Sequence, residues 1–79
     1  MNIRLLFFGP TADMIGSRSF EISANDGSTP AGILEHLRSD HPGLATHRLL
    51  FAVNEEHSDG SRPLKDGDQL AIFTPVSGG

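Results

Sequence analysis

The chain contains one segment with the periodicity of a packed α-helix, and this limits the folds open to it more than any other feature. Three apolar residues recur on one stripe of that segment: Ile33, Leu34 and Leu37. Thr29-Pro30 is a favourable helix start, because the hydroxyl caps the first turn and proline suits the first helical position. The residue before a proline avoids the α region, so His41-Pro42 ends the helix. We predict a single main helix from about Pro30 to Asp40.

The remaining chain contains several short segments with the pattern of strands. Apolar or alternating runs predict four of them, at Asn2–Phe8, Ser17–Ile22, Leu49–Asn54 and Gln69–Thr74. Turn sequences separate the strands at residues 25–28, at Asp59-Gly60 within a polar hairpin segment, and at Asp66–Asp68. Residues 11–16 form a connection to which the sequence assigns no defined shape.

The order of these elements restricts the topology. A ferredoxin-like fold needs a second helix, for which the chain has no room. We therefore predict an α+β fold of the β-grasp (ubiquitin-like) class, in which one main helix packs across a mixed sheet and the first and last strands are neighbours. The helix stripe would then cover one face of these two strands, formed by Ile3, Leu5, Phe7, Leu70 and Ile72.

Length and composition indicate one small domain, residues 1–79, in which residues 75–79 form an extended, flexible C-terminal tail. The net charge is −4 and Lys65 is the sole lysine, so the chain lacks the basic surface that nucleic acids and anionic membranes require. The apolar run 3–8 is too short for a signal-peptide core or a membrane span, so we expect a cytoplasmic protein.

The sequence offers no conventional catalytic group. It has no Cys nucleophile and no glycine-rich phosphate loop. Its four histidines have no known metal-ligand spacing, and solvated side chains explain them: His36, His41, His47 and His57. We expect neither a metal site nor a permanently bound cofactor.

The C-terminus is the exception. A Gly78-Gly79 end arises by chance at about 0.5%, given glycine usage near 7% per position. Residues 74–79 follow directly from the last strand, Pro75 favours an extended path, and the segment reaches roughly 20 Å. Two glycines present no side chain to the walls of a narrow channel in another protein.

Such a tail suits chemistry at its terminal carboxylate. ATP can activate the Gly79 carboxylate as an acyl-adenylate, which a sulfur or nitrogen nucleophile then displaces. This protein would supply the acyl group and a partner would supply the catalytic machinery, so the chain is not expected to be catalytic alone.

The C-terminal block carries a family likeness. Residues 66–79 contain a D-G-D turn, an apolar strand and a P-V-S-G-G end, and the chain also has Ala52-Val53-Asn54 and an opening strand that ends in Phe7-Phe8. It resembles the MoaD/ThiS-type sulfur carriers, and among them the small subunits of molybdopterin synthase.

The resemblance implies a mechanism and a set of partners. An E1-like enzyme would adenylate Gly79 with ATP and Mg²⁺, and a persulfide enzyme would supply the sulfur that converts the carboxylate to a thiocarboxylate. The carrier loaded with sulfur would bind the large catalytic subunit in a heterotetramer and give its sulfur to the cyclic pyranopterin precursor in molybdenum cofactor biosynthesis.

A second contact surface should accompany the tail, because ordering each tail residue in a partner costs about 1–2 kcal/mol. Leu6, Phe8 and Phe73 point away from the predicted core and would form an exposed apolar patch, a common mark of an interface. The expected partner-binding set adds the tail to this patch: Leu6, Phe8, Phe73, Pro75, Val76 and Ser77.

The residues alone leave three other functions open. A thiazole-pathway or other thiocarboxylate carrier would use the same tail chemistry with a different acceptor. A ubiquitin-like modifier would form isopeptide bonds with lysines. An interaction domain without covalent chemistry would keep its function when Gly79 is deleted.

Overall fold

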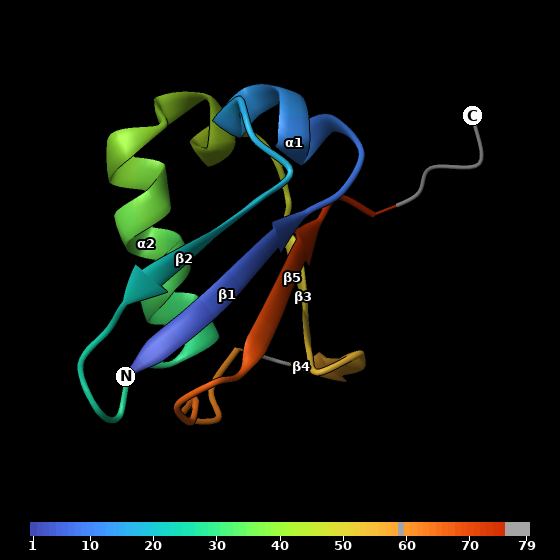
Figure 1. Cartoon of the computed structure of the whole chain (residues 1–79). Coiled ribbons are helices and arrows are strands. Elements are labelled where there is room, and N and C mark those ends of the chain that lie inside the picture. Colours follow the sequence, from blue (N-terminus) through green and yellow to red (C-terminus); the bar gives the residue numbers. More distant parts are fainter. Residues whose placement is uncertain (59, 76–79) are drawn as a thin grey trace.

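The computed structural model describes residues 1–58 and 60–75. Its elements follow along the chain as β1 (Asn2–Phe7), α1 (Pro10–Ile15), β2 (Ser19–Ser23), α2 (Pro30–Asp40), the 3-10 helix η1 (Pro42–Thr46), β3 (Leu50–Val53), β4 (Glu56–Ser58) and β5 (Gln69–Phe73). Within the described residues the strands form one sheet in the order β2-β1-β5-β3-β4, and α2 lies across one face of it (Figure 1).

The first and last strands lie side by side at the centre of the sheet. β1 and β5 run parallel, with Leu5 opposite Leu70 and Phe7 opposite Ile72. The β1–β2, β3–β4 and β3–β5 pairs are antiparallel. A mixed sheet with adjacent terminal strands and a helix across it confirms the predicted α+β, β-grasp fold.

The hydrophobic core lies between α2 and the inner face of the sheet. Its buried apolar residues are Ile3, Leu5, Phe7, Ile33, Leu34, Leu37, Leu44, Leu49, Leu64, Leu70 and Ile72. The helix stripe and the two central strands therefore share one core, as predicted. Each such side chain contributes about 1.5–3 kcal/mol through removal from water, so this core is the main source of stability.

The helix α2 begins and ends where its local sequence predicts. The hydroxyl oxygen of Thr29 accepts a hydrogen bond from the Gly32 amide at 3.2 Å, and Pro30 occupies the first helical position. At the other end the His41 amide donates to the Leu37 carbonyl at 2.7 Å before the chain enters η1. Short-range capping thus sets both ends of α2.

Two helical segments occur where the sequence assigns none. α1 has six residues and η1 has five, so neither is long enough to show a periodic apolar stripe. Both are held by tertiary contacts, because Thr11 of α1 and Leu44 of η1 are fully buried. Within the described residues, no helix is long and apolar enough to cross a membrane.

The hairpin turn lies five residues earlier than predicted. β3 and β4 are joined at Asn54-Glu55, where φ is 49° and 72°, as in a two-residue type I′ turn. The predicted position, Asp59-Gly60, is wrong, and Asp59 lies outside the described residues. Gly60 has a different role: its carbonyl accepts a hydrogen bond from the Ala31 amide at 3.1 Å in the first turn of α2.

Candidate functional site

The end of β5 is the structural base of the C-terminal segment. β5 ends at Phe73, and the described chain continues through Thr74 to an exposed Pro75. Figure 1 shows this end leaving the sheet beside α1, on the side away from β2. The last central strand therefore leads directly towards the C-terminal residues that the sequence singles out.

Thr11 fixes the end of β5 to its neighbours. Its hydroxyl lies 2.6 Å from the Phe8 carbonyl oxygen and 3.0 Å from the Ile72 carbonyl oxygen, so one hydrogen is shared between the two acceptors. The Phe8 amide also donates to the Ile72 carbonyl at 3.2 Å. Because Thr11 is fully buried, these bonds hold β1, α1 and β5 together immediately before the chain leaves the sheet.

Thr11 was missed by sequence reasoning. Its Ile72 contact joins positions 61 residues apart, and no local pattern reports such a pair. The available signal was Gly9-Pro10, which marks a turn into a possible helix start, but it does not say that the next side chain is buried.

An apolar surface covers the outer face of the sheet, the face away from α2. Register places Leu6 beside Ala71 and Ala71 beside Ala52, and it places Leu50 beside Phe73. Phe8 follows β1 at the same end and is 53% exposed, while the others are half-buried. We call this surface the outer apolar patch, and its members are Leu6, Phe8, Leu50, Ala52, Ala71 and Phe73.

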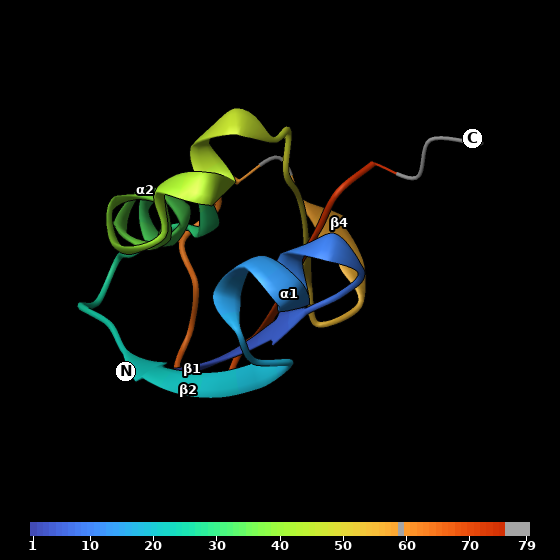
Figure 2. The same ribbon diagram turned by 90° about the horizontal axis from the view of Figure 1, so that it is seen from above.

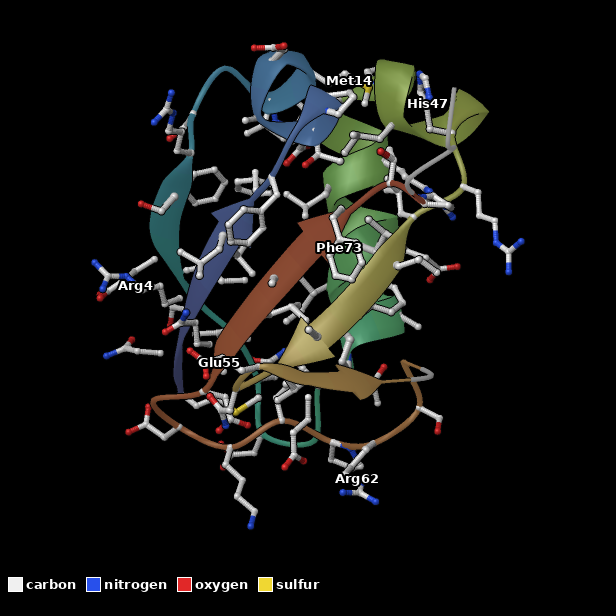
Figure 3. All side chains as sticks on the ribbon, turned by 90° about the vertical axis from the view of Figure 1, so that its right-hand side faces the viewer. Arg4, Met14, His47, Glu55, Arg62 and Phe73 are labelled. Carbon is white, nitrogen blue, oxygen red and sulfur yellow. The ribbon has the colours of Figure 1, made fainter. Side chains whose placement is uncertain are left out.

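Figure 3 views this face directly, with α2 behind the sheet. Phe73 lies over the centre of this face, whereas Arg4 lies nearer the start of β1, away from the end of the sheet at which β5 ends. Register pairs Arg4 with Gln69, so the row nearest the start of β5 is polar. The apolar rows are thus concentrated towards the end of β5 from which the tail leaves.

The structure brings together the described members of the predicted site. Leu6, Phe8 and Phe73 belong to the outer apolar patch, and Pro75 follows it on the exit path. Val76, Ser77, Gly78 and Gly79 lie outside the described residues, so their predicted roles remain predictions.

Two apolar residues from the short helical segments pack on the core side of the sheet. Leu44 of η1 is fully buried in the core, and Met14 of α1 packs partly against that same core. Sequence reasoning also missed Leu50, Ala52 and Ala71, which join the patch only through strand register. Their signal was alternation along β3 and β5, which becomes informative once the strand order is known.

A polar network holds the other end of β5. The Asp68 carboxylate accepts hydrogen bonds from the Lys65 amide at 2.7 Å and from the Asn54 side-chain amide at 2.9 Å. These bonds stabilise the charged form and lower the pKa of Asp68. Asn54 also accepts from the Gln69 amide at 3.0 Å, so the β3–β4 turn is tied to the start of β5.

Metal chemistry has no support in the described side chains. Across residues 1–58 and 60–75, no group of three or more His, Cys, Asp or Glu residues is placed to hold a metal ion. The chemically distinctive feature is instead the covalent continuation of β5 towards the terminal glycines.

Fold and site together define a class: a β-grasp protein whose central last strand leads past an apolar sheet face into a Gly-Gly terminus. The sequence model of the ThiS family matches residues 5–79. The chain therefore belongs to the ThiS family.

Relatives in sequence and structure carry more specific names. The molybdopterin synthase sulfur carrier subunit of Escherichia coli K12 is 37% identical, over 98% of this chain and 99% of that protein. In a structure described as the complex of subunits 1 and 2 of molybdopterin-converting factor from Helicobacter pylori 26695, one chain is 33% identical with a TM-score of 0.70, over the full length of both. The crystal structure of SAMP1 from Haloferax volcanii is 26% identical with a TM-score of 0.83, again over both chains.

Proposed function

We propose that this chain is the sulfur carrier subunit of a molybdopterin synthase. The observation that carries the proposal is the full-length likeness to the Escherichia coli subunit of that name, together with a family match that reaches Gly79. The exit of β5 beside the outer apolar patch supports it, because a carrier needs both a reactive end and a surface that positions that end in a partner.

The chemistry resides at the Gly79 carboxylate. An E1-like enzyme, with ATP and Mg²⁺, joins this carboxylate to AMP and releases pyrophosphate. A persulfide then displaces AMP, and a second thiol cleaves the sulfur–sulfur bond to leave the thiocarboxylate. In this scheme Gly78 keeps the approach to the activating site free of side chains.

Sulfur transfer restores the carrier. The thiocarboxylate sulfur attacks a carbon of the cyclic pyranopterin precursor and displaces an oxygen substituent from that carbon. Water then hydrolyses the resulting thioester, which leaves the sulfur on the pterin and a carboxylate on Gly79. We assign this cycle to the cytoplasm and to a heterotetramer with a large catalytic subunit, in line with the two-subunit complex from Helicobacter pylori.

The docking contact assigned to the large subunit is the outer apolar patch. Phe8 is the exposed large hydrophobic residue of the described chain, and its neighbours Leu6 and Phe73 lie on the same face. Binding there would offset the ordering cost of Pro75, Val76, Ser77 and the two glycines, about 1–2 kcal/mol per residue.

Intact-protein mass spectrometry tests the carrier role. The chain with a free C-terminus is incubated with ATP, Mg²⁺, the E1-like enzyme of the same organism and a persulfide source. We expect a mass gain equal to the exchange of one oxygen for sulfur, localised to Gly79 and lost when Gly79 is deleted. No gain, while a known carrier is converted in parallel, contradicts the proposal.

The acceptor is then identified in a second assay. Thiocarboxylated carrier is added to the large subunit and the pyranopterin precursor, and dithiolene formation is followed. Transfer to a thiazole precursor would instead indicate a thiazole-pathway carrier. Conjugation to protein lysines would instead indicate a ubiquitin-like modifier.

A further inference from the structure

A groove lies between α2 and the edge strand β2, on the inner side of the sheet. Its volume is about 560 Å³. Ile22, Ile33 and Leu37 give it apolar walls, while Glu35 and Asp40 contribute carboxylates from α2. In Figure 2, α2 and β2 lie apart and are joined by the connection that precedes α2. We call this feature the β2–α2 groove.

β2 is an edge strand along this groove. Within the described residues it comes first in the sheet order and has one neighbouring strand, β1. The hydrogen bonds Phe7 N to Arg18 O and Ala24 N to Met1 O, both 2.8 Å, show that even-numbered residues of this segment pair with β1. By antiparallel alternation, the amide and carbonyl groups of Glu21 and Ser23 point to the free edge.

The walls of the groove are only partly covered. Phe20 and Ile22 face inward from β2 but are half-buried, whereas their β1 partners Leu5 and Ile3 are fully buried. An additional strand along β2 would therefore place alternate side chains over apolar surface that α2 does not cover.

The charge around the groove selects one kind of occupant. Glu35 and Asp40 are exposed on the α2 side of the groove. Among the described residues that line the groove, none is Lys or Arg. An incoming strand with basic side chains on the face towards α2 would thus meet these two carboxylates.

We propose that the β2–α2 groove binds an extended basic peptide segment of a partner protein, which adds a strand to the free edge of β2. Side chains at alternate positions of the segment face α2; the apolar ones among them pack on Ile22 and Leu37, and the basic ones pair with Glu35 and Asp40. Backbone bonds to Glu21 and Ser23 fix its register.

This site is separate from the sulfur carrier surface. The groove lies on the helix side of the sheet, whereas the outer apolar patch lies on the opposite face, and the chain leaves β5 on the side away from β2 (Figure 1). The proposed peptide can therefore bind while the tail and the patch are engaged elsewhere. The proposal does not depend on the chemistry of Gly79.

The test uses a synthetic probe and the full-length chain. A blocked six-residue peptide, Thr-Arg-Thr-Val-Thr-Arg, presents arginine and valine on the same face and spans about 20 Å, enough to cover β2. It is titrated into ¹⁵N-labelled protein, and amide shifts are mapped by NMR. We expect saturable shifts at residues 19–25 and on the α2 wall of the groove, with weakening as salt increases.

Two matched controls separate the elements of the proposal. The double variant Glu35→Lys/Asp40→Lys should bind the peptide about tenfold more weakly, at about threefold per exposed pair, while the control Glu56→Lys on β4 should bind it unchanged. A peptide that is N-methylated on the amides facing β2 should lose binding, because strand addition requires those donors.

Several results would overturn the proposal. These are the absence of saturable shifts with the basic peptide, shifts confined to the outer apolar patch or β4, and equal binding of the same peptide with glutamate in place of arginine. Concentration-dependent shifts of β2 amides without any peptide would assign the groove to a second copy of the chain and would also contradict it.

Discussion

Replacing Phe8 with alanine should weaken binding of the large subunit by about thirtyfold and leave the monomer folded. A phenylalanine side chain presents about 150–250 Å² to solvent, so an exposure of 53% leaves roughly 100 Å² to be buried in a complex. At about 25 cal/mol per Å² this area corresponds to about 2.5 kcal/mol, of which alanine retains a small part. The remaining loss of about 2 kcal/mol is about thirtyfold in Kd.

Isothermal titration calorimetry with the large subunit of the same organism measures this change. Urea unfolding of the free variant should give the stability of the unsubstituted protein within about 0.5 kcal/mol, because surface positions outside the core rarely contribute more. Phe8→Leu should recover most of the affinity, since it restores apolar area. Arg18→Ala, at an exposed position between α1 and β2, serves as the control and should bind normally.

Phe73→Asp extends the test to the centre of the outer apolar patch. Phe73 faces Leu50 across the β3–β5 pair, so a carboxylate there would have to lose water when a partner covers it. We expect a larger loss than for Phe8→Ala, with the fold verified by circular dichroism. Affinities within twofold of the unsubstituted protein for both variants would refute the assignment of the patch as the docking surface.

Three further predictions concern the scaffold and are measured by urea unfolding. Gly60→Ala should destabilise the protein by about 2–3 kcal/mol, since φ is +86° there and an added Cβ would lie 2.9 Å from Phe51 Cε2; an unchanged midpoint would contradict the close packing. Glu55→Gly should stabilise it by about 0.5–1 kcal/mol because φ is 72°, and a loss would show that the Glu55 side chain matters more than backbone strain. The pKa of Asp68 is lowered by bonds from the Lys65 amide and Asn54, so its contribution is present above the unfolded-state value of 3.8 and is lost as pH falls through the lower folded-state pKa. Because Asp68 lies at the surface and is only half-buried, Asp68→Asn should cost no more than about 1 kcal/mol at pH 7 and less at pH 3, and an equal cost at both would refute the linkage.

The parts of the fold that local chemistry controls were predictable. Thr29-Pro30 and His41-Pro42 act within a few residues of themselves, and α2 has the predicted bounds. α1 depends instead on the burial of Thr11 against a carbonyl 61 residues away. The hairpin turn was misplaced because Gly60 matches a turn signal but is needed for close packing on Phe51.

The candidate site also contains residues that local sequence predicts and residues that it does not. Alternation along the first strand predicts that Leu6 points outward and, with Phe8 beyond the strand end, belongs to an exposed surface. The addition of Leu50, Ala52 and Ala71 requires the register of β5 against two neighbours, and the sequence does not contain that register in any local form.

The central position of β5 explains how one small chain can combine a rigid base with a reactive end. β5 is paired on both sides, by β1 and by β3, and Leu70 and Ile72 anchor it in the core. Hydrogen bonds from the Thr11 hydroxyl and the Phe8 amide to the Ile72 carbonyl fix the end of β5, where the chain leaves the sheet. In the proposed complex, contacts at the outer apolar patch would offset the cost of ordering the C-terminal residues in a partner. The position of this patch relative to the end of β5 is already fixed, so docking need not order the body of the carrier as well.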